Sequence, residues 1–280
     1  MNATDPARPS AGLRWFFGVS AVLAAVAGFQ LFVGAADTDR FFSWTIDPPL
    51  TAAFLGAAYW AAMVLLAWAA GQRSWARART ALPAVFTIAV LLVVATVIHL
   101  DRFHHDLFGR FWEAVYLVVV PLLAYLTWSQ VRRSGPAEDE CRPLPGWLRA
   151  VLCVQALGML ALGVALFAAP VGASSLWPWA LTPLTGRAIG AFLVGFGAAA
   201  AFAVGDDEFG RLHGAALAYA TLGALELAAA AFHGEDFTAP AMGVAVYVAA
   251  CASVLAVGLY GAVRSPGSAE RPPDRGSRPP

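Results

Sequence analysis

Apolar stretches separated by short polar ones run along the whole chain of 280 residues. Eight of these stretches approach or exceed about 20 residues, the length at which an α-helix crosses the hydrocarbon core of a bilayer. They predict an all-α integral membrane protein with eight transmembrane helices, at residues 15–34, 50–70, 81–100, 111–128, 148–171, 184–204, 212–232 and 239–263.

One short phrase occurs twice, each time between two apolar stretches. Residues 44–51 read Trp-Thr-Ile-Asp-Pro-Pro-Leu-Thr, and residues 179–185 read Trp-Ala-Leu-Thr-Pro-Leu-Thr. The register continues beyond the phrase, since offsets of 134 and 131 residues pair His99 with His233 and Tyr116 with Tyr247. We interpret the chain as two parallel four-helix repeats related by a pseudo-twofold axis along the membrane normal, because an even number of spans inserts both copies the same way up.

This interpretation sets the domain boundaries. The repeats cover residues 12–131 and 147–264, and residues 132–146 form a polar cytoplasmic linker. We expect residues 1–11 and 265–280 to be disordered, because they are polar and contain several prolines. Of the 18 arginines, fourteen fall on the side of the two termini, so the positive-inside rule predicts a plasma-membrane protein with both termini in the cytoplasm.

Composition supports the membrane and excludes other classes. Only 13% of the residues are charged, against about 25% in a soluble domain. A net charge of zero leaves no basic surface for nucleic acid. The three cysteines lack the spacing of a disulfide framework or a zinc site, and phosphate-loop, metalloprotease and nucleophile-elbow motifs are absent. The sequence therefore leans against an enzyme and predicts no resident cofactor, while the oligomeric state stays open.

The repeated phrase predicts a helix-entry turn in each repeat. A residue before proline avoids the α region, and proline suits the first turn of a helix. We interpret the tryptophans as anchors at the membrane interface, with a pair of re-entrant loops as the alternative. Small residues four apart follow each phrase and predict a helix seam, which we place between the repeats. The residues of the phrase are Trp44, Asp47, Pro48, Pro49 and Thr51, and Trp179, Thr182, Pro183 and Thr185.

Charged residues within the spans are the candidates for a polar pocket. Glu226 lies about two turns inside the seventh span, where an ionisable group usually faces the bundle interior or a wet cavity. Arg187 begins the sixth span and could meet Glu226 as an ion pair, either as a structural clamp or as part of a site. Glu113 lies one turn inside the fourth span and could join them.

Two histidines end pseudo-equivalent spans. His99 and His233 are placed where a donor caps a helix C-terminus, and we favour that role. The same pair could hold a haem iron or a divalent metal, although haem ligands are usually buried within the bilayer and these lie at its rim.

Residues 177–190, Trp-Pro-Trp-Ala-Leu-Thr-Pro-Leu-Thr-Gly-Arg-Ala-Ile-Gly, resemble a motif of uncharacterised bacterial multi-pass membrane proteins of actinobacterial type. The resemblance covers one loop and helix start and implies no activity. Three hypotheses follow. The first is a protein that binds or transports a small solute through an outward-facing polar pocket between the repeats, lined by Glu226, Arg187, Glu113, His99 and His233. The second is a haem- or metal-binding redox protein, and the third is a structural or accessory subunit.

Overall fold

The computed structural model describes residues 8–104, 107–134 and 142–265. Within these ranges every long element is a helix, and eight helices are long and apolar enough to cross a membrane. The predicted tails and linker fall partly on residues 1–7, 135–141 and 266–280, which lie outside the described residues. The long helices are α1 (Ala11–Phe32), α3 (Pro49–Gly71), α5 (Leu82–Ile98), α6 (Leu107–Arg133), α7 (Gly146–Ala168), α9 (Pro183–Asp206), α10 (His213–Phe232) and α11 (Ala241–Arg264).

Short elements connect them. The first half, α1 to α6, contains α2 (Thr38–Phe41) and α4 (Trp75–Ala78), and the second half, α7 to α11, contains α8 (Pro170–Ala173). The described residues also form one-turn 3₁₀ helices at 79–81, 100–102, 174–176, 209–211 and 234–236. The long α7 ends at Ala168, three residues before the predicted end, because Pro170 has no backbone N–H to continue the helix.

Local signals explain where the helices begin. The hydroxyl of Ser10 accepts a hydrogen bond from the backbone N–H of Leu13 at the start of α1. Thr182 and Thr185 form a capping box at the start of α9, whose first residue is Pro183. The corresponding helix α3 also begins with proline, at Pro49, but no side chain of its own loop caps it. These turns are the helix entries that the repeated phrase predicts.

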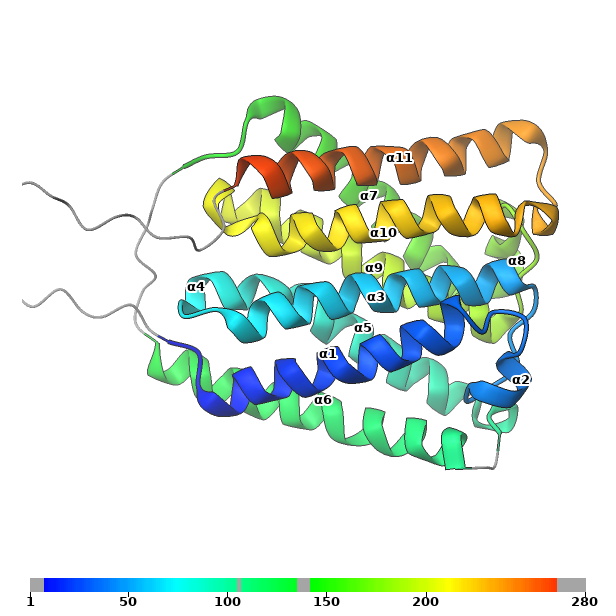
Figure 1. Ribbon diagram of the computed structural model, residues 1–280, viewed down its shortest axis with the longest axis horizontal. Coiled ribbons are helices and arrows are strands. Elements are labelled where there is room, and N and C mark those ends of the chain that lie inside the picture. The colour runs from blue at the N-terminus through cyan, green and yellow to red at the C-terminus, as the bar shows by residue number, and fades with distance from the viewer. Residues whose placement is uncertain (1–7, 105–106, 135–141, 266–280) are drawn as a thin grey trace, which may run out of the picture.

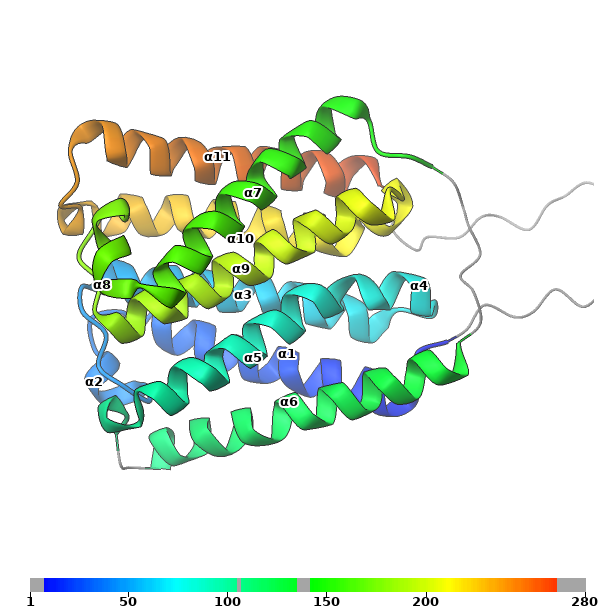
Figure 2. The same ribbon diagram turned by 180° about the vertical axis from the view of Figure 1, so that it is seen from behind.

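The eight helices form a bundle with all long axes roughly along one direction (Figures 1 and 2). Helix α1 packs along α3, and α7 packs along α9 in the same way. The two halves meet through two further pairs, α3 with α10 and α9 with α5. Because each half contributes its second and third long helix to the centre, α3 is the most buried span, whereas α6 and α11 lie at the periphery.

A glycine allows a close approach of the first two long helices in each half. A Cβ at Gly56 of α3 would lie 2.5 Å from the backbone nitrogen of Phe32 in α1. A Cβ at Gly190 of α9 would lie 2.7 Å from the carbonyl oxygen of Gly163 in α7. The glycine seam predicted from the sequence is therefore real but misplaced. It joins the first two long helices of each half and not one half to the other. A small residue allows close packing against the nearest helix, which is α1 for α3 and α7 for α9.

In each half, one backbone hydrogen bond ties two connecting loops together. The N–H of His104 donates to the carbonyl oxygen of Ser43 at 2.9 Å, and the N–H of Thr238 donates to that of Pro178 at 3.0 Å. In each case the loop after the third long helix is tied to the loop before the second. Both α1 and α7 begin at the same end of the bundle (Figure 2).

Candidate functional site

Glu226 is the most deeply buried carboxylate among the candidate pocket residues. It lies on α10 with 2% of its surface exposed. Its Oε2 accepts a hydrogen bond from the hydroxyl of Tyr247 on α11 at 2.9 Å, whereas Oε1 has no hydrogen-bond partner within the described part of the chain. The carboxyl group is therefore held by the neighbouring helix of its own half.

Arg187 does not meet Glu226, so the predicted ion pair is wrong. Its Nη1 lies 2.7 Å from Nε2 of His99, which follows the last residue of α5. The reason is helix adjacency, because α9 packs on α5 whereas α10 packs on α3. Partial burial of the ring and the positive charge of Arg187 lower the pKa of His99 from its usual value, and Asp101 opposes that change. The neutral ring can accept the hydrogen bond from the guanidinium.

The other two candidates lie apart from this pair. Glu113 is half-buried on α6, and His233 is half-buried immediately after α10. No hydrogen bond or ion pair between described residues joins Glu226, Glu113 or His233 to Arg187. A polar pocket lined by all five residues stays a prediction.

The metal hypothesis gains no geometric support. In the described ranges, no three His, Cys, Asp or Glu side chains gather as a metal-binding group. Arg187 also occupies the Nε2 of His99, one of the two ring nitrogens through which histidine binds a metal ion. A cation at that position competes with a metal for the same lone pair.

The repeated tryptophans are buried and not interfacial anchors. Trp44 and Trp179 are 4% and 1% exposed. The prediction was wrong because a tryptophan flanked by polar residues reads the same whether its ring points to lipid or into a loop core. Each ring lies in an aromatic cluster, of Phe42, Phe103 and Trp112 around Trp44, and of Trp177, Phe237 and Tyr247 around Trp179.

The tryptophans in the two copies of the phrase differ in their hydrogen bonds. The indole Nε1 of Trp179 donates to the hydroxyl of Thr51 at 2.8 Å and so links the halves. The indole nitrogen of Trp44 has no such partner among the described residues. The remaining phrase residues form the turns themselves: Asp47 is exposed and its peptide bond to Pro48 is cis, while Thr182 and Pro183 are exposed at the start of α9.

The backbone N–H of Leu50, at the start of α3, donates to Asp236 of the second half at 2.8 Å. An acidic group is favoured at a helix N-terminus, so this carboxylate supplies the cap that the α3 loop lacks. Together with the Trp179–Thr51 bond, it fastens the start of α3 to the second half.

A cavity of about 350 Å³ lies in the first half, between α1, α3, α5 and α6. Its size falls within the range of small-molecule sites, roughly 300–1,000 Å³. Most of its wall is aliphatic or aromatic. The polar side chains on the wall are Ser20 and Gln30 of α1, Ser43 of the following loop, Tyr59 of α3, and Trp112 and Tyr116 of α6. None of the five candidate pocket residues lines it.

Two tyrosines are the main polar feature of this wall. The hydroxyls of Tyr59 and Tyr116 are 3.0 Å apart and hydrogen-bonded to each other. The indole Nε1 of Trp112, one turn before Tyr116, is already committed to the hydroxyl of Thr96 at 3.2 Å. On the α3 and α6 side of this cavity, the tyrosine pair therefore carries the remaining hydrogen-bonding capacity.

The cavity exists because α6 diverges from α1. At the start of α1, the side chain of Gln130 accepts from the N–H of Ser10 at 2.7 Å and donates to the carbonyl oxygen of Arg8 at 3.0 Å. The two helices then separate toward the far end of the bundle (Figure 1). Sequence reasoning missed this cavity, although Tyr59 and Tyr116 are polar residues within apolar spans and could have marked it.

No family model, curated protein or solved structure matches this chain. The inference of function therefore rests on the geometry of the described residues.

Proposed function

We propose that this multi-pass membrane protein binds a small hydrophobic molecule in the cavity of its first half. The observation that carries the proposal is a largely apolar cavity of about 350 Å³ with one tyrosine pair on its wall. The solute-binding role predicted from the sequence is retained, but its place moves from the charged residues to α1, α3, α5 and α6.

The hydroxyl protons of the two tyrosines indicate which polar group the ligand carries. Each tyrosine hydroxyl has one proton to donate, and one of the two protons is used between Tyr59 and Tyr116. The second proton is available to a ligand. The preferred ligand is therefore an apolar molecule with one accepting group, a carbonyl or a hydroxyl oxygen.

The bilayer is the natural source of such a ligand. Two residues of the cavity wall that lie on membrane-spanning helices, Val26 of α1 and Phe111 of α6, are each at least half exposed at the surface of the bundle. On a membrane-spanning helix an exposed apolar side chain faces lipid. An apolar molecule dissolved in the membrane thus reaches the cavity without crossing water.

Filling the cavity tests the proposal. Ala89 of α5 lines it and is 6% exposed, so Ala89→Leu places three more carbons in the binding space. We expect the wild-type protein, purified in mild detergent, to retain a hydrophobic molecule that mass spectrometry of its organic extract detects, and Ala89→Leu to lose it. Tyr116→Phe should weaken retention by roughly tenfold or less, the value of one hydrogen bond.

Gly158→Leu on the exposed face of α7 is the matched control, because a Cβ there meets nothing within 4 Å. It should retain the molecule. Equal retention by Ala89→Leu and wild type would overturn the proposal. So would a polar solute whose uptake into vesicles depends on Glu226 and not on Ala89, because that result favours the pocket predicted from the charged residues.

We further propose that the chain is a tandem repeat of two four-helix units, inserted the same way up with both termini in the cytoplasm. Support comes from the paired bonds His104–Ser43 and Thr238–Pro178, and from glycine crossings at equivalent places. The fourteen-to-four division of arginines supports the orientation. Labelling of single cysteines introduced next to Ser10 and Asp47 in intact cells tests it, with accessibility expected only near Asp47.

A further inference from the structure

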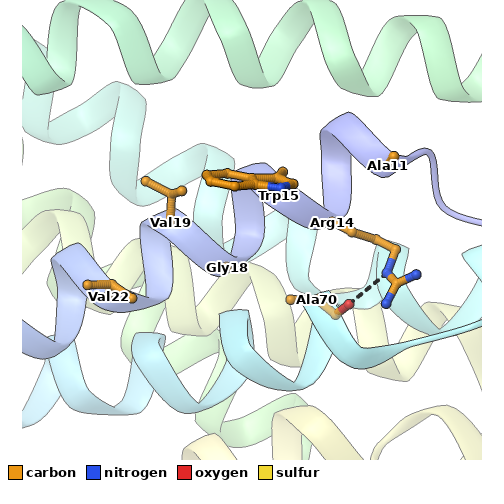
Figure 3. Close-up of a pocket in the computed structure, with 7 residues that line it drawn as sticks. All are labelled: Ala11, Arg14, Trp15, Gly18, Val19, Val22 and Ala70. Atoms are coloured by element: carbon orange, nitrogen blue, oxygen red, sulfur yellow. Dashed lines mark hydrogen bonds between the residues drawn. The ribbon is translucent and has the colours of Figure 1, made fainter.

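A groove runs along the outside of α1 near its first residue (Figure 3). This open groove has a volume of about 460 Å³ and shares no lining residue with the cavity of the first half. Trp15 and Val22, which line it, are 75% and 64% exposed, so this face of α1 points away from the bundle. The lining residues are Ala11, Arg14, Trp15, Gly18, Val19 and Val22 of α1 and Ala70 of α3.

Arg14 supplies a positive charge at one end of the groove. Its Nε donates to the carbonyl oxygen of Ala70 at 3.0 Å, which fixes the guanidinium over the seam between α1 and α3 (Figure 3). No carboxylate of the described residues lies within ion-pair distance of Arg14. The remaining guanidinium N–H groups are thus directed to the surroundings, where a phosphate could accept from two of them.

In the second half, a carboxylate neutralises the equivalent arginine. Arg149, the counterpart of Arg14 on α7, forms an ion pair with Asp207 at 3.2 Å. In the first half the position equivalent to Asp207 is Arg73, which is exposed. The first half therefore has two cations where the second half has a balanced pair, and an anionic partner is favoured only on the first half.

The shape of the groove fits a chain. A Cβ at Gly18 would meet nothing within 4 Å, so this glycine leaves open space on the helix surface between Trp15 and Val22. Trp15 lies beside Arg14, and tryptophan is enriched at the level of lipid headgroups. Charge, aromatic ring and apolar notch follow one another along α1, in the order in which a phospholipid presents phosphate, glycerol and acyl chain.

We propose that this groove binds an anionic phospholipid, with the phosphate on Arg14, the interfacial region against Trp15 and an acyl chain over Gly18 toward Val22. The site is separate from the ligand cavity, which is lined by other residues of α1.

Native mass spectrometry of the full chain in detergent tests the site, with phosphatidylglycerol and phosphatidylcholine as the added lipids. We expect tighter binding of phosphatidylglycerol and an approximately fivefold loss of that binding in Arg14→Gln, the effect of one basic residue near a membrane surface. Gly18→Leu should also reduce it, because the leucine side chain occupies the acyl-chain path while Arg14 is unchanged.

Matched variants keep the test specific. Arg149→Gln and Gly158→Leu alter the corresponding charge and an open glycine of α7, and both should bind phosphatidylglycerol like the wild type. Equal affinity for the two lipids would overturn the proposal, as would an equal loss in Arg149→Gln. Displacement of the lipid by inorganic phosphate alone would identify a site for a free anion and would also overturn it.

Discussion

The two halves of this protein differ most at their last helix. In the second half α11 packs closely along α10, whereas in the first half α6 packs loosely on α5 and leaves the cavity. A Cβ at Gly223 of α10 would lie 2.5 Å from the backbone nitrogen of Leu255. Ala89, the residue at the equivalent place in α5, already has that methyl group. A methyl group at this position is therefore compatible with the open first half but not with the close packing of the second.

A second glycine acts in the same direction. Gly258 of α11 lies against the backbone of Ala220 in α10, where a Cβ would overlap it. Its counterpart in α6 is Thr127. Small residues let helix backbones approach closely in lipid, so the second half is built for packing and the first half for a space beside α6.

The largest expected effect comes from replacing one of these two glycines of the second half by alanine. Gly258→Ala or Gly223→Ala should push α11 away from α10 and destabilise the protein by roughly 1–3 kcal/mol, the usual cost of overpacking. Alanine is intrinsically the better helix former, so a loss of stability isolates the packing term. Unfolding by denaturing detergent measures it. Gly158→Ala, which meets nothing within 4 Å, should be neutral or slightly stabilising; an equal loss there would contradict the comparison.

The buried carboxyl group of the second half is the next test. Tyr247→Phe removes the donor to Oε2 of Glu226 and so leaves both carboxyl oxygens without a hydrogen-bond partner among the described residues. It should cost about 1–3 kcal/mol, because a buried polar group then loses its partner. In the first half the position equivalent to Glu226 is Leu92. The double variant Glu226→Leu with Tyr247→Phe should therefore recover most of the loss. A double variant less stable than Tyr247→Phe in the same unfolding measurement would show that Glu226 has another stabilising partner.

The paired tryptophans should give a smaller difference. Trp179→Phe removes a hydrogen bond to Thr51, while Trp44→Phe removes an indole N–H that has no partner among the described residues. Since both variants lose similar aromatic area, Trp179→Phe should be the more destabilising by about 1 kcal/mol. The prediction is contradicted if the two variants unfold at the same detergent concentration, or if Trp44→Phe is the less stable of the two.

The sequence predicts the eight spans well but not their neighbours. Length and hydropathy define a span, and all eight long helices occur where an apolar stretch does. These helices are apolar on every side, so no polar face shows which helix lies next to which. Arg187 consequently contacts His99 and not Glu226, and the glycine seam lies within each half and not between the halves.

The cavity depends on small differences that a pattern of apolar residues does not reveal. Ala89 and Gly223 are equally acceptable in an apolar span, yet they decide whether the next helix can approach. The charged residues drew attention instead, because their cost in lipid is large and readable from sequence. Tyr59 and Tyr116 stand out in the sequence as polar residues within apolar spans, but their hydrogen bond is visible only in the folded chain.

The smallest expected effect is a pH dependence that arises at His99, in the first half. Burial and the charge of Arg187 lower the pKa of His99 in the folded protein below the usual 6.5. As the pH falls below that value, the unfolded chain therefore takes up a proton before the folded chain does. The stability that the neutral ring contributes is thus complete above pH 6.5 and declines as the pH falls toward the lowered pKa.

Substitution separates this contribution from the rest of the chain. His99→Gln should reduce the loss of stability between pH 7 and pH 5, and Arg187→Ala should reduce it partly, because burial of the ring remains. Gly158→Ala, where a Cβ meets nothing within 4 Å, is the control and should leave the pH profile unchanged. Unfolding curves at several pH values measure all three variants. A pH dependence that is the same in His99→Gln as in the wild type would remove the Arg187–His99 contact as its cause.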